Sequence, residues 1–191
     1  MSHFYAMLFR MRNIERWSLM RNMFGENLSE HTLEVAFIAH ALAVISNKRF
    51  GTNYNAEKAA VAAMFHDVPE IITGDLPTPV KYYNPQIKSA YAQIEREAKQ
   101  NLVSLLPSDL QEEFNGIFNI EPEIKTLVHA ADKIQALIKC NDELSLGNLE
   151  FAAAKTATEQ AVNKIDLPAV KVFLEEFMPS FSLPLDSQTK E

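Results

Sequence analysis

The stretch "SEHTLEVAFIAHALAVIS", residues 29–46, gives the clearest indication of the fold class. Its large apolar side chains recur at helical spacing on the face that carries His31. They are Val35, Ile38, Leu42 and Ile45. Asn27 can cap such a helix, as can Ser29, and Glu30 lies where a capping box with Asn27 requires it. The sequence therefore predicts a helix over about 27–46 that directs His31 into the interior.

Helical patterns continue along most of the chain, and no alternating strand pattern competes with them. Further helices are predicted at 2–12, Ala56–Val68, 85–105, a short one from Pro107, Glu121–Leu146, 149–164 and 167–177. Residues 16–22 read as irregular, and Gly74 with two prolines predicts a loop over 73–79. We therefore expect an all-α fold with one domain over residues 1–180 and a loosely ordered tail over 181–191.

Composition indicates a globular protein of a reducing compartment. Hydrophobic residues make up 47% of the 191, which is enough for a sizeable core. The single cysteine, Cys140, excludes an internal disulfide and a cysteine-ligated zinc cluster. The N-terminus lacks a secretory pattern, and the uncharged stretch 35–47 is too short to span a bilayer. We expect a cytoplasmic protein without a membrane partner.

The net charge of −7 argues against a nucleic-acid polymer as partner, because an acidic protein repels polyanions. The first 25 residues are locally basic, with one acid, Glu15, against Arg10, Arg12, Arg16 and Arg21. Such a patch can hold a single phosphate group, or it can be a solvated face. Composition alone favours the solvated face.

A second stretch, "MFHDVPEIITGDLPTP" at 64–79, places His66 and Asp67 at the end of an apolar helix. A buried carboxylate there is costly unless something compensates it, and a cation would do so. A solvated helix end is the alternative. Pro69 is predicted to kink the chain just after the pair and so to re-aim Glu70.

Asp132 in "HAADKIQAL" lies at the edge of an apolar stripe in a predicted long helix. Asp is mildly unfavourable inside a helix, so a specific interaction is expected to hold it there. A salt bridge to Lys133 or an exposed rim position is the alternative. His129 is either a supporting group or without a role, and His40 falls on the face opposite to His31.

Taken one at a time, these residues fit ordinary structural roles. For His31 that role is a core histidine hydrogen-bonded to the backbone. Taken together, two His and two Asp come from three predicted helices near the core. Mixed nitrogen and oxygen ligands suit Mn, Fe, Co, Ni or Zn. Four ligands leave coordination positions for water and substrate, as in a catalytic site.

The order of His31, then His66–Asp67, then Asp132 resembles the HD-domain metal phosphohydrolases. The stretches "RWSLMRN", "SEHTLEVAFIAHAL", "FHDVPEIITGDLPTPVKYYN" and "ADKIQALIKC" resemble the bacterial 5′-deoxynucleotidases of that superfamily, in order and spacing, over nearly the whole chain. The resemblance implies an HD-domain helical bundle with a central metal site. It also implies a homodimer that removes the 5′-phosphate from deoxynucleoside 5′-monophosphates.

The resemblance also implies roles for particular residues. The metal ligands would be His31, His66, Asp67 and Asp132, and the catalytic residues Glu70, Arg16 and Asp75. The substrate-binding residues would be Arg16, Trp17, His31, Asp67, Asp75, Leu76, Pro77, Thr78 and Asp132. Cobalt or manganese is the expected ion, with zinc, iron or nickel as further possibilities. Pro69 departs from the family, which more often has Ser there.

Three other functions compete with this one. Another HD activity would act on a nucleoside triphosphate, a guanosine polyphosphate or a cyclic nucleotide. The loop offers few basic residues beyond Lys81, which disfavours a triphosphate. A non-catalytic metal-bound nucleotide sensor would have no need of Glu70. A helical scaffold without metal would tolerate loss of His31.

Overall fold

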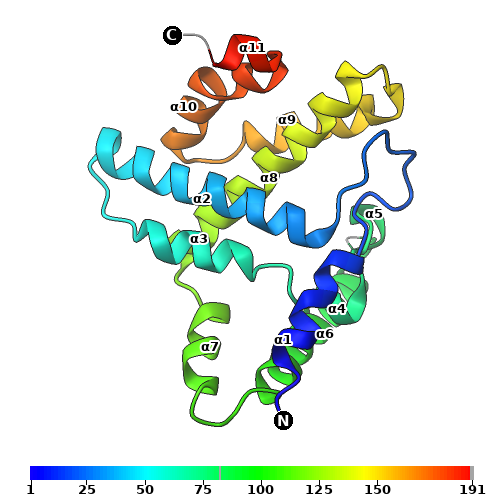
Figure 1. The fold of residues 1–191 in the computed structure, drawn as a ribbon, viewed down its shortest axis with the longest axis vertical. Helices are drawn as coiled ribbons and strands as arrows, with labels where there is room; N and C mark the ends of the chain where they lie inside the picture. The colour runs from blue at the N-terminus through cyan, green and yellow to red at the C-terminus, as the bar shows by residue number, and fades with distance from the viewer. Residues whose placement is uncertain (82, 190–191) are drawn as a thin grey trace.

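A computed structural model describes residues 1–81 and 83–189, apart from the side chain of Thr78. The described chain is built from helices and contains no strand, which confirms the all-α prediction (Figure 1). A single antiparallel bridge joins Glu15 to Asn27. The elements, in chain order, are α1 (Phe4–Leu8), η1 (Phe9–Asn13), α2 (Leu28–Phe50), α3 (Ala56–Met64), α4 (Glu70–Thr73), α5 (Thr78–Lys81), α6 (Pro85–Ser104), α7 (Gln111–Phe118), α8 (Pro122–Ser145), η2 (Leu149–Phe151), α9 (Ala152–Val162), α10 (Pro168–Glu176), η3 (Met178–Ser182) and α11 (Leu185–Gln188).

The two longest helices, α2 and α8, cross at the centre of the molecule (Figure 1). Helices α3 and α10 pack on α2, and α9 packs on α8. The apolar stripe predicted around Leu42 is buried, as is its counterpart on α8 around Ile134. Their contact forms the main core and fixes the positions of His31 on α2 and Asp132 on α8.

A smaller apolar cluster lies beside the main core. It joins α1, α6 and the first turn of α2 to the turn that follows α3, through Phe4, Met11, Leu28, Val68, Leu102 and Leu106. Val68 is fully buried in it, one residue after Asp67. The cluster therefore anchors the segment that carries the His66–Asp67 pair.

Both ends of α2 have recognisable caps. The Asn27 side chain accepts hydrogen bonds from the backbone N–H groups of Ser29 and Glu30, and the Glu30 carboxylate accepts one from Asn27 N–H. This confirms the predicted capping box. The helix continues four residues beyond the predicted end at residue 46 and stops at Gly51, whose φ of 70° is left-handed.

The helix predicted over 56–68 ends earlier, at Met64, so His66 and Asp67 lie in tight turns rather than in the helix. The N–H groups of Phe65 and His66 bond to carbonyls three residues back. Pro69 also disfavours continuation of the α-helix through this segment, because a proline disfavours helical geometry in the residue before it. The interruption thus precedes the pair, whereas the sequence suggested a kink after it, and Pro69 caps α4, which starts at Glu70.

Other boundaries also differ from the predictions. Pro107 starts a single turn, closed by Leu110 N–H on the Pro107 carbonyl, and α7 begins only at Gln111. Within the loop predicted over 73–79, Thr73 ends α4 and α5 begins at residue 78, because Pro79 in a first turn needs no N–H partner. The segment 181–191 contains the end of η3 and α11, and residues 190–191 lie outside the described part.

Helix α2 is long and apolar enough to cross a membrane, by length and composition only. Within the fold, 56% of its most apolar 18-residue window is buried, and the core helix of a globular protein passes the same test.

Candidate active site

Two histidines present free ring nitrogens to one point in the interior. His66 Nδ1 lies 2.6 Å from the Ala63 carbonyl oxygen, which can only accept, so Nδ1 carries the proton. His31 Nδ1 lies 2.8 Å from Gln135 Oε1, and the Gln135 amide nitrogen is held by carboxylates. Both Nε2 atoms are therefore lone-pair donors, and both are buried without a hydrogen-bond partner among the described residues.

Two carboxylates face these nitrogens. Asp67 Oδ2 lies 3.0 Å from His66 Nε2 and 3.5 Å from His31 Nε2, and Asp132 Oδ1 lies 3.3 Å from His31 Nε2. Ligand atoms about 2.1 Å from one ion and about 90–110° apart would be separated by roughly 3.0–3.4 Å. His31, His66 and Asp67 therefore have the spacing of ligands around one metal ion, and Asp132 lies at a similar distance from His31. These four side chains are here called the four-residue cluster.

The electrostatics of the cluster also favour a cation. Burial lowers the pKa of His31, but the neighbouring carboxylates of Asp132 and Asp67 outweigh it and raise that pKa well above its usual value. Burial opposes ionisation of Asp67, yet the neighbouring His66 and His31 hold its pKa well below the ordinary range. Positive charge is thus stabilised where the two histidines and two aspartates meet.

Glu70 lies beside this cluster and is 6% exposed. Burial, and then the charges of Asp67 and Asp75, raise its pKa to about 9. Its Oε2 atom is buried without a hydrogen-bond partner among the described residues. A carboxyl group in this setting can hold or release a proton near neutral pH once a cation lowers its pKa.

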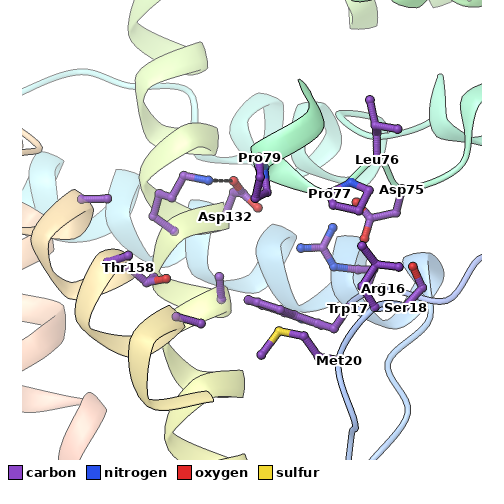
Figure 2. Close-up of a pocket in the computed structure, with 16 residues that line it drawn as sticks. Arg16, Trp17, Ser18, Met20, Asp75, Leu76, Pro77, Pro79, Asp132 and Thr158 are labelled. Atoms are coloured by element: carbon purple, nitrogen blue, oxygen red, sulfur yellow. Dashed lines mark hydrogen bonds and ion pairs between the residues drawn. The ribbon is translucent and has the colours of Figure 1, made fainter. Parts of the chain in front are cut away.

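A cavity of about 710 Å³ opens beside the cluster (Figure 2). The Arg16 guanidinium and the Trp17 ring point into it from one side. Asp75, Leu76 and Pro77 line another side, and Asp132 lines it from α8. Small residues of α8 and α9 line a further part of the wall, namely Ala136, Ala154, Ala157, Thr158 and Ala161. Arg16 Nη1 lies 3.6 Å from Asp67 Oδ2 and so connects the cavity with the four-residue cluster.

Residues 15–27, here called the 15–27 loop, position Arg16 and Trp17. Hydrogen bonds from Arg16 N–H to the Glu26 carbonyl and from Leu28 N–H to the Ile14 carbonyl close the base of the loop. Its far side is held by Glu143, whose carboxylate accepts from the N–H groups of Met23 and Phe24. The loop is thus closed at its base and held to α8 at its far side.

Most side chains proposed from the sequence converge on the cluster and the cavity. Glu70 is buried beside the cluster and is not part of the cavity wall. Asp132 combines both interpretations made from the sequence, because Oδ1 faces His31 while Oδ2 pairs with Lys133 at 2.9 Å. The side chain of Thr78 lies outside the described part of the structure.

The basic N-terminal segment does not act as one patch. Arg16 alone among its four arginines lines the cavity. Arg21 pairs with Glu150, and Arg10 and Arg12 are exposed. His40 and His129 are exposed as well, away from the four-residue cluster.

Three residues of the site were missed by sequence reasoning. Glu26 and Gln135 are buried polar residues behind His31, and Lys133 lines the cavity next to Asp132. A buried polar position within the α8 stripe was the available signal for Gln135, which follows Ile134 on the helix. Glu26 gave no signal, because it reaches the site only through the folding of the 15–27 loop.

Comparison with known proteins places the chain in one family. The family model described as 5′-deoxynucleotidase YfbR-like matches residues 3–181. The 5′-deoxynucleotidase VV1113 of Vibrio vulnificus is 51% identical over 188 residues, covering 97% of each chain. A 5′-deoxynucleotidase of Yersinia pestis is 50% identical over 189 residues, covering 97% of this chain and 96% of that protein.

Solved structures show the same fold at lower identity. An HD-domain phosphohydrolase from Listeria innocua superposes with a TM-score of 0.82 at 22% identity, covering 94% of this chain and 88% of that one. The cyanophage S-2L HD phosphohydrolase, bound to dA and one catalytic Zn²⁺ ion, gives 0.68 at 20% identity, covering 92% and 95%. The family match over residues 3–181, with relatives about half identical over nearly the whole chain, shows that this chain belongs to the YfbR-like 5′-deoxynucleotidase family.

Proposed function

We propose that this protein is a metal-dependent 5′-deoxynucleotidase that hydrolyses deoxynucleoside 5′-monophosphates to a deoxynucleoside and phosphate. One observation carries the proposal: the His31, His66, Asp67 and Asp132 cluster adjoins a cavity lined by Arg16. The names of the relatives at about half identity support the same substrate class.

The donor set fits a divalent transition ion, with His31, His66, Asp67 and Asp132 as its ligands. Two buried Nε2 lone pairs without partners among the described residues and two carboxylates suit Co²⁺ or Mn²⁺, and also Zn²⁺, Fe²⁺ or Ni²⁺. When bound, such an ion lowers the pKa of a water and neutralises phosphate charge. We infer Co²⁺ or Mn²⁺ from the family resemblance.

Arg16 and Lys133 are the cations that line the described cavity wall. Arg16 can hold two phosphate oxygens in a bidentate manner, which leaves the phosphorus oriented for attack by water. As the water oxygen bonds to phosphorus, the bond to the 5′ oxygen breaks. Glu70 can orient that water and take or return the proton that the leaving 5′ oxygen requires.

Trp17 and Asp75 would select the sugar. The Trp17 ring projects into the cavity and can crowd a 2′-hydroxyl, so that deoxyribose fits better than ribose (Figure 2). The Asp75 carboxylate lines the same cavity and can accept a hydrogen bond from the 3′-hydroxyl. Leu76, Pro77 and, by family resemblance, Thr78 would complete this side of the nucleotide site.

The test is phosphate release from deoxy- and ribonucleoside 5′-monophosphates by chelator-stripped protein with Co²⁺, Mn²⁺, Mg²⁺ or Zn²⁺ added. We expect metal-dependent release that favours the deoxy substrates. His31→Ala should lose both the activity and the stoichiometric ion. Release from triphosphates or cyclic nucleotides alone would assign the site to another HD activity, and absence of release from folded, metal-loaded protein would refute the proposal.

We further propose a cytoplasmic homodimer that has neither membranes nor nucleic-acid polymers as partners. Helix α2 exposes Leu33, Phe37 and Val44 along one face, and apolar side chains of this kind often mark an interface. The net charge of −7 supports exclusion of polyanions. Light scattering should give twice the chain mass for the parent and the single chain mass for Phe37→Glu; monomeric parent protein would refute the dimer.

A further inference from the structure

Glu26 is a buried carboxylate that belongs to neither the metal-ligand set nor the cavity wall. It is 7% exposed and lies in the 15–27 loop, two residues before α2 begins. A buried carboxylate is unfavourable unless its oxygens receive hydrogen bonds. Both Glu26 oxygens do receive them, and the two come from different parts of the site.

The Oε1 atom faces the metal-ligand side. It accepts a hydrogen bond of 2.7 Å from Gln135 Nε2 and lies 3.3 Å from His31 Nδ1. The bond orients the Gln135 amide so that its Oε1 atom faces His31 and accepts from Nδ1–H. Glu26 thereby helps to fix the His31 tautomer that leaves Nε2 free for an ion.

The Oε2 atom faces the substrate side. It accepts a hydrogen bond of 2.8 Å from Trp17 Nε1. Trp17 has a φ of 55°, the only positive value among the non-glycine residues that the structure describes. A bulky side chain in the left-handed region is strained and persists only where its surroundings hold it. The Glu26 hydrogen bond therefore helps to fix where the indole ring projects into the cavity.

We propose that Glu26 is a positioning and specificity-determining residue. One carboxylate oxygen orients the proposed metal ligand His31 by way of Gln135, and the other orients the ring of Trp17, the proposed sugar-selecting residue. Only the half of this inference that concerns Trp17, here called the Oε2 arm, rests on the proposed function; the half that concerns His31 is the Oε1 arm. Arg16 is held in the same arrangement, since its backbone N–H donates to the Glu26 carbonyl at 2.8 Å. Metal affinity and the preference for deoxyribose should therefore change together when the Glu26 carboxylate is altered.

The main test is Glu26→Gln, which keeps the shape but removes the charge and places an amide group against donors. We expect affinity for Co²⁺ or Mn²⁺, titrated alone, to fall at least about tenfold. The ratio of kcat/KM for a deoxynucleoside over its ribonucleoside monophosphate should fall about fivefold, as for one lost hydrogen bond. Retention of both values within twofold of the parent would overturn the proposal.

Single-arm variants keep the test decisive if Glu26→Gln folds poorly. Trp17→Phe removes the indole N–H and should lower the sugar preference without changing metal affinity. Gln135→Met should weaken metal binding without changing the sugar preference. If the sugar preference of Trp17→Phe equals that of the parent, the proposed role of Glu26 Oε2 is wrong. If the metal affinity of Gln135→Met equals that of the parent, the proposed role of Glu26 Oε1 is wrong. Glu34→Gln is the matched control. Glu34 accepts a hydrogen bond of 2.9 Å from Gln135 Nε2, and no contact joins it to Trp17 in the described structure. The sugar preference of Glu34→Gln should therefore stay at the parent value.

Failure of the proposed function is distinguishable from failure of this inference. If the parent protein releases no phosphate from any deoxynucleotide, the proposed function is wrong, while the metal titrations still test the Oε1 arm. If the parent is active and the variants match it, the inference about Glu26 is wrong and the proposed function stands.

Discussion

Neutralising Glu143 should destabilise the fold and loosen the 15–27 loop. The Glu143 side chain is fully buried on α8 and accepts hydrogen bonds from the N–H groups of Met23 and Phe24 and from Asn148 Nδ2. It also pairs with Lys139, which is 7% exposed. The change to make is Glu143→Gln, because the amide keeps the shape and loses the charge.

The magnitude follows from the pKa of the group. Burial raises the pKa of Glu143, but the bonds from Lys139 and the loop N–H groups outweigh it and bring it from 4.5 to about 2. That difference corresponds to about 3 kcal/mol of stability at neutral pH. Since the folded-state pKa is the lower one, the contribution is complete above pH 4.5 and is lost as the pH falls towards 2. The same linkage between pKa and stability gives a contribution of Glu143 to the free energy of unfolding of about 2 kcal/mol at pH 3.5.

Urea unfolding followed by circular dichroism at pH 7 and pH 3.5 measures this directly. The gap in unfolding free energy between parent and Glu143→Gln should shrink between the two pH values. Glu150→Gln is the matched control, because its partner Arg21 is exposed, and it should leave stability nearly unchanged. A gap below 1 kcal/mol at pH 7, or one that grows in acid, would refute the reasoning.

Three further predictions concern the site. Glu70→Gln should lower kcat at least about 100-fold while the affinity for the metal, measured by titration, stays near the parent value; equal kcat would remove Glu70 from the chemistry. Asp75→Asn should raise KM about tenfold for deoxynucleotides, as for a lost hydrogen bond to a charged group, with a smaller change in kcat. A KM within twofold of the parent would contradict contact with the sugar. Lys133→Met should weaken inhibition by inorganic phosphate about fivefold, because it removes a cation from the cavity wall; unchanged inhibition would place Lys133 away from the phosphate.

Sequence periodicity was sufficient for the helical core, because burial of one helical face is a local property of the chain. The stripes around Leu42 and Ile134 are buried as predicted, and Asn27 caps α2. The end of α3 was not predictable in this way. Met64 ends the helix where Val68, a few residues on, packs into a cluster with residues of α1 and α6, and that contact has no local signature.

The residues of the candidate site also differ in whether local sequence could identify them. The proposed metal ligands, two His and two Asp, each fit an ordinary structural role alone, and could be recognised from the sequence only as a set. Glu26 and Gln135 are 109 residues apart, and their hydrogen bond exists only after α2, α8 and the 15–27 loop have come together. Supporting residues of this kind act through non-local contacts, so composition and spacing did not identify them.

Charge explains how an acidic protein can take an anionic substrate. Five carboxylates and two cationic side chains gather at the site, namely Glu26, Asp67, Glu70, Asp75 and Asp132 with Arg16 and Lys133. A bound divalent ion would offset most of this excess and, together with Arg16, would place two positive groups next to a single phosphate group. A polymer would instead spread its charges over a surface whose net charge is −7. We therefore expect the ligand of this site to be a mononucleotide rather than a nucleic-acid chain.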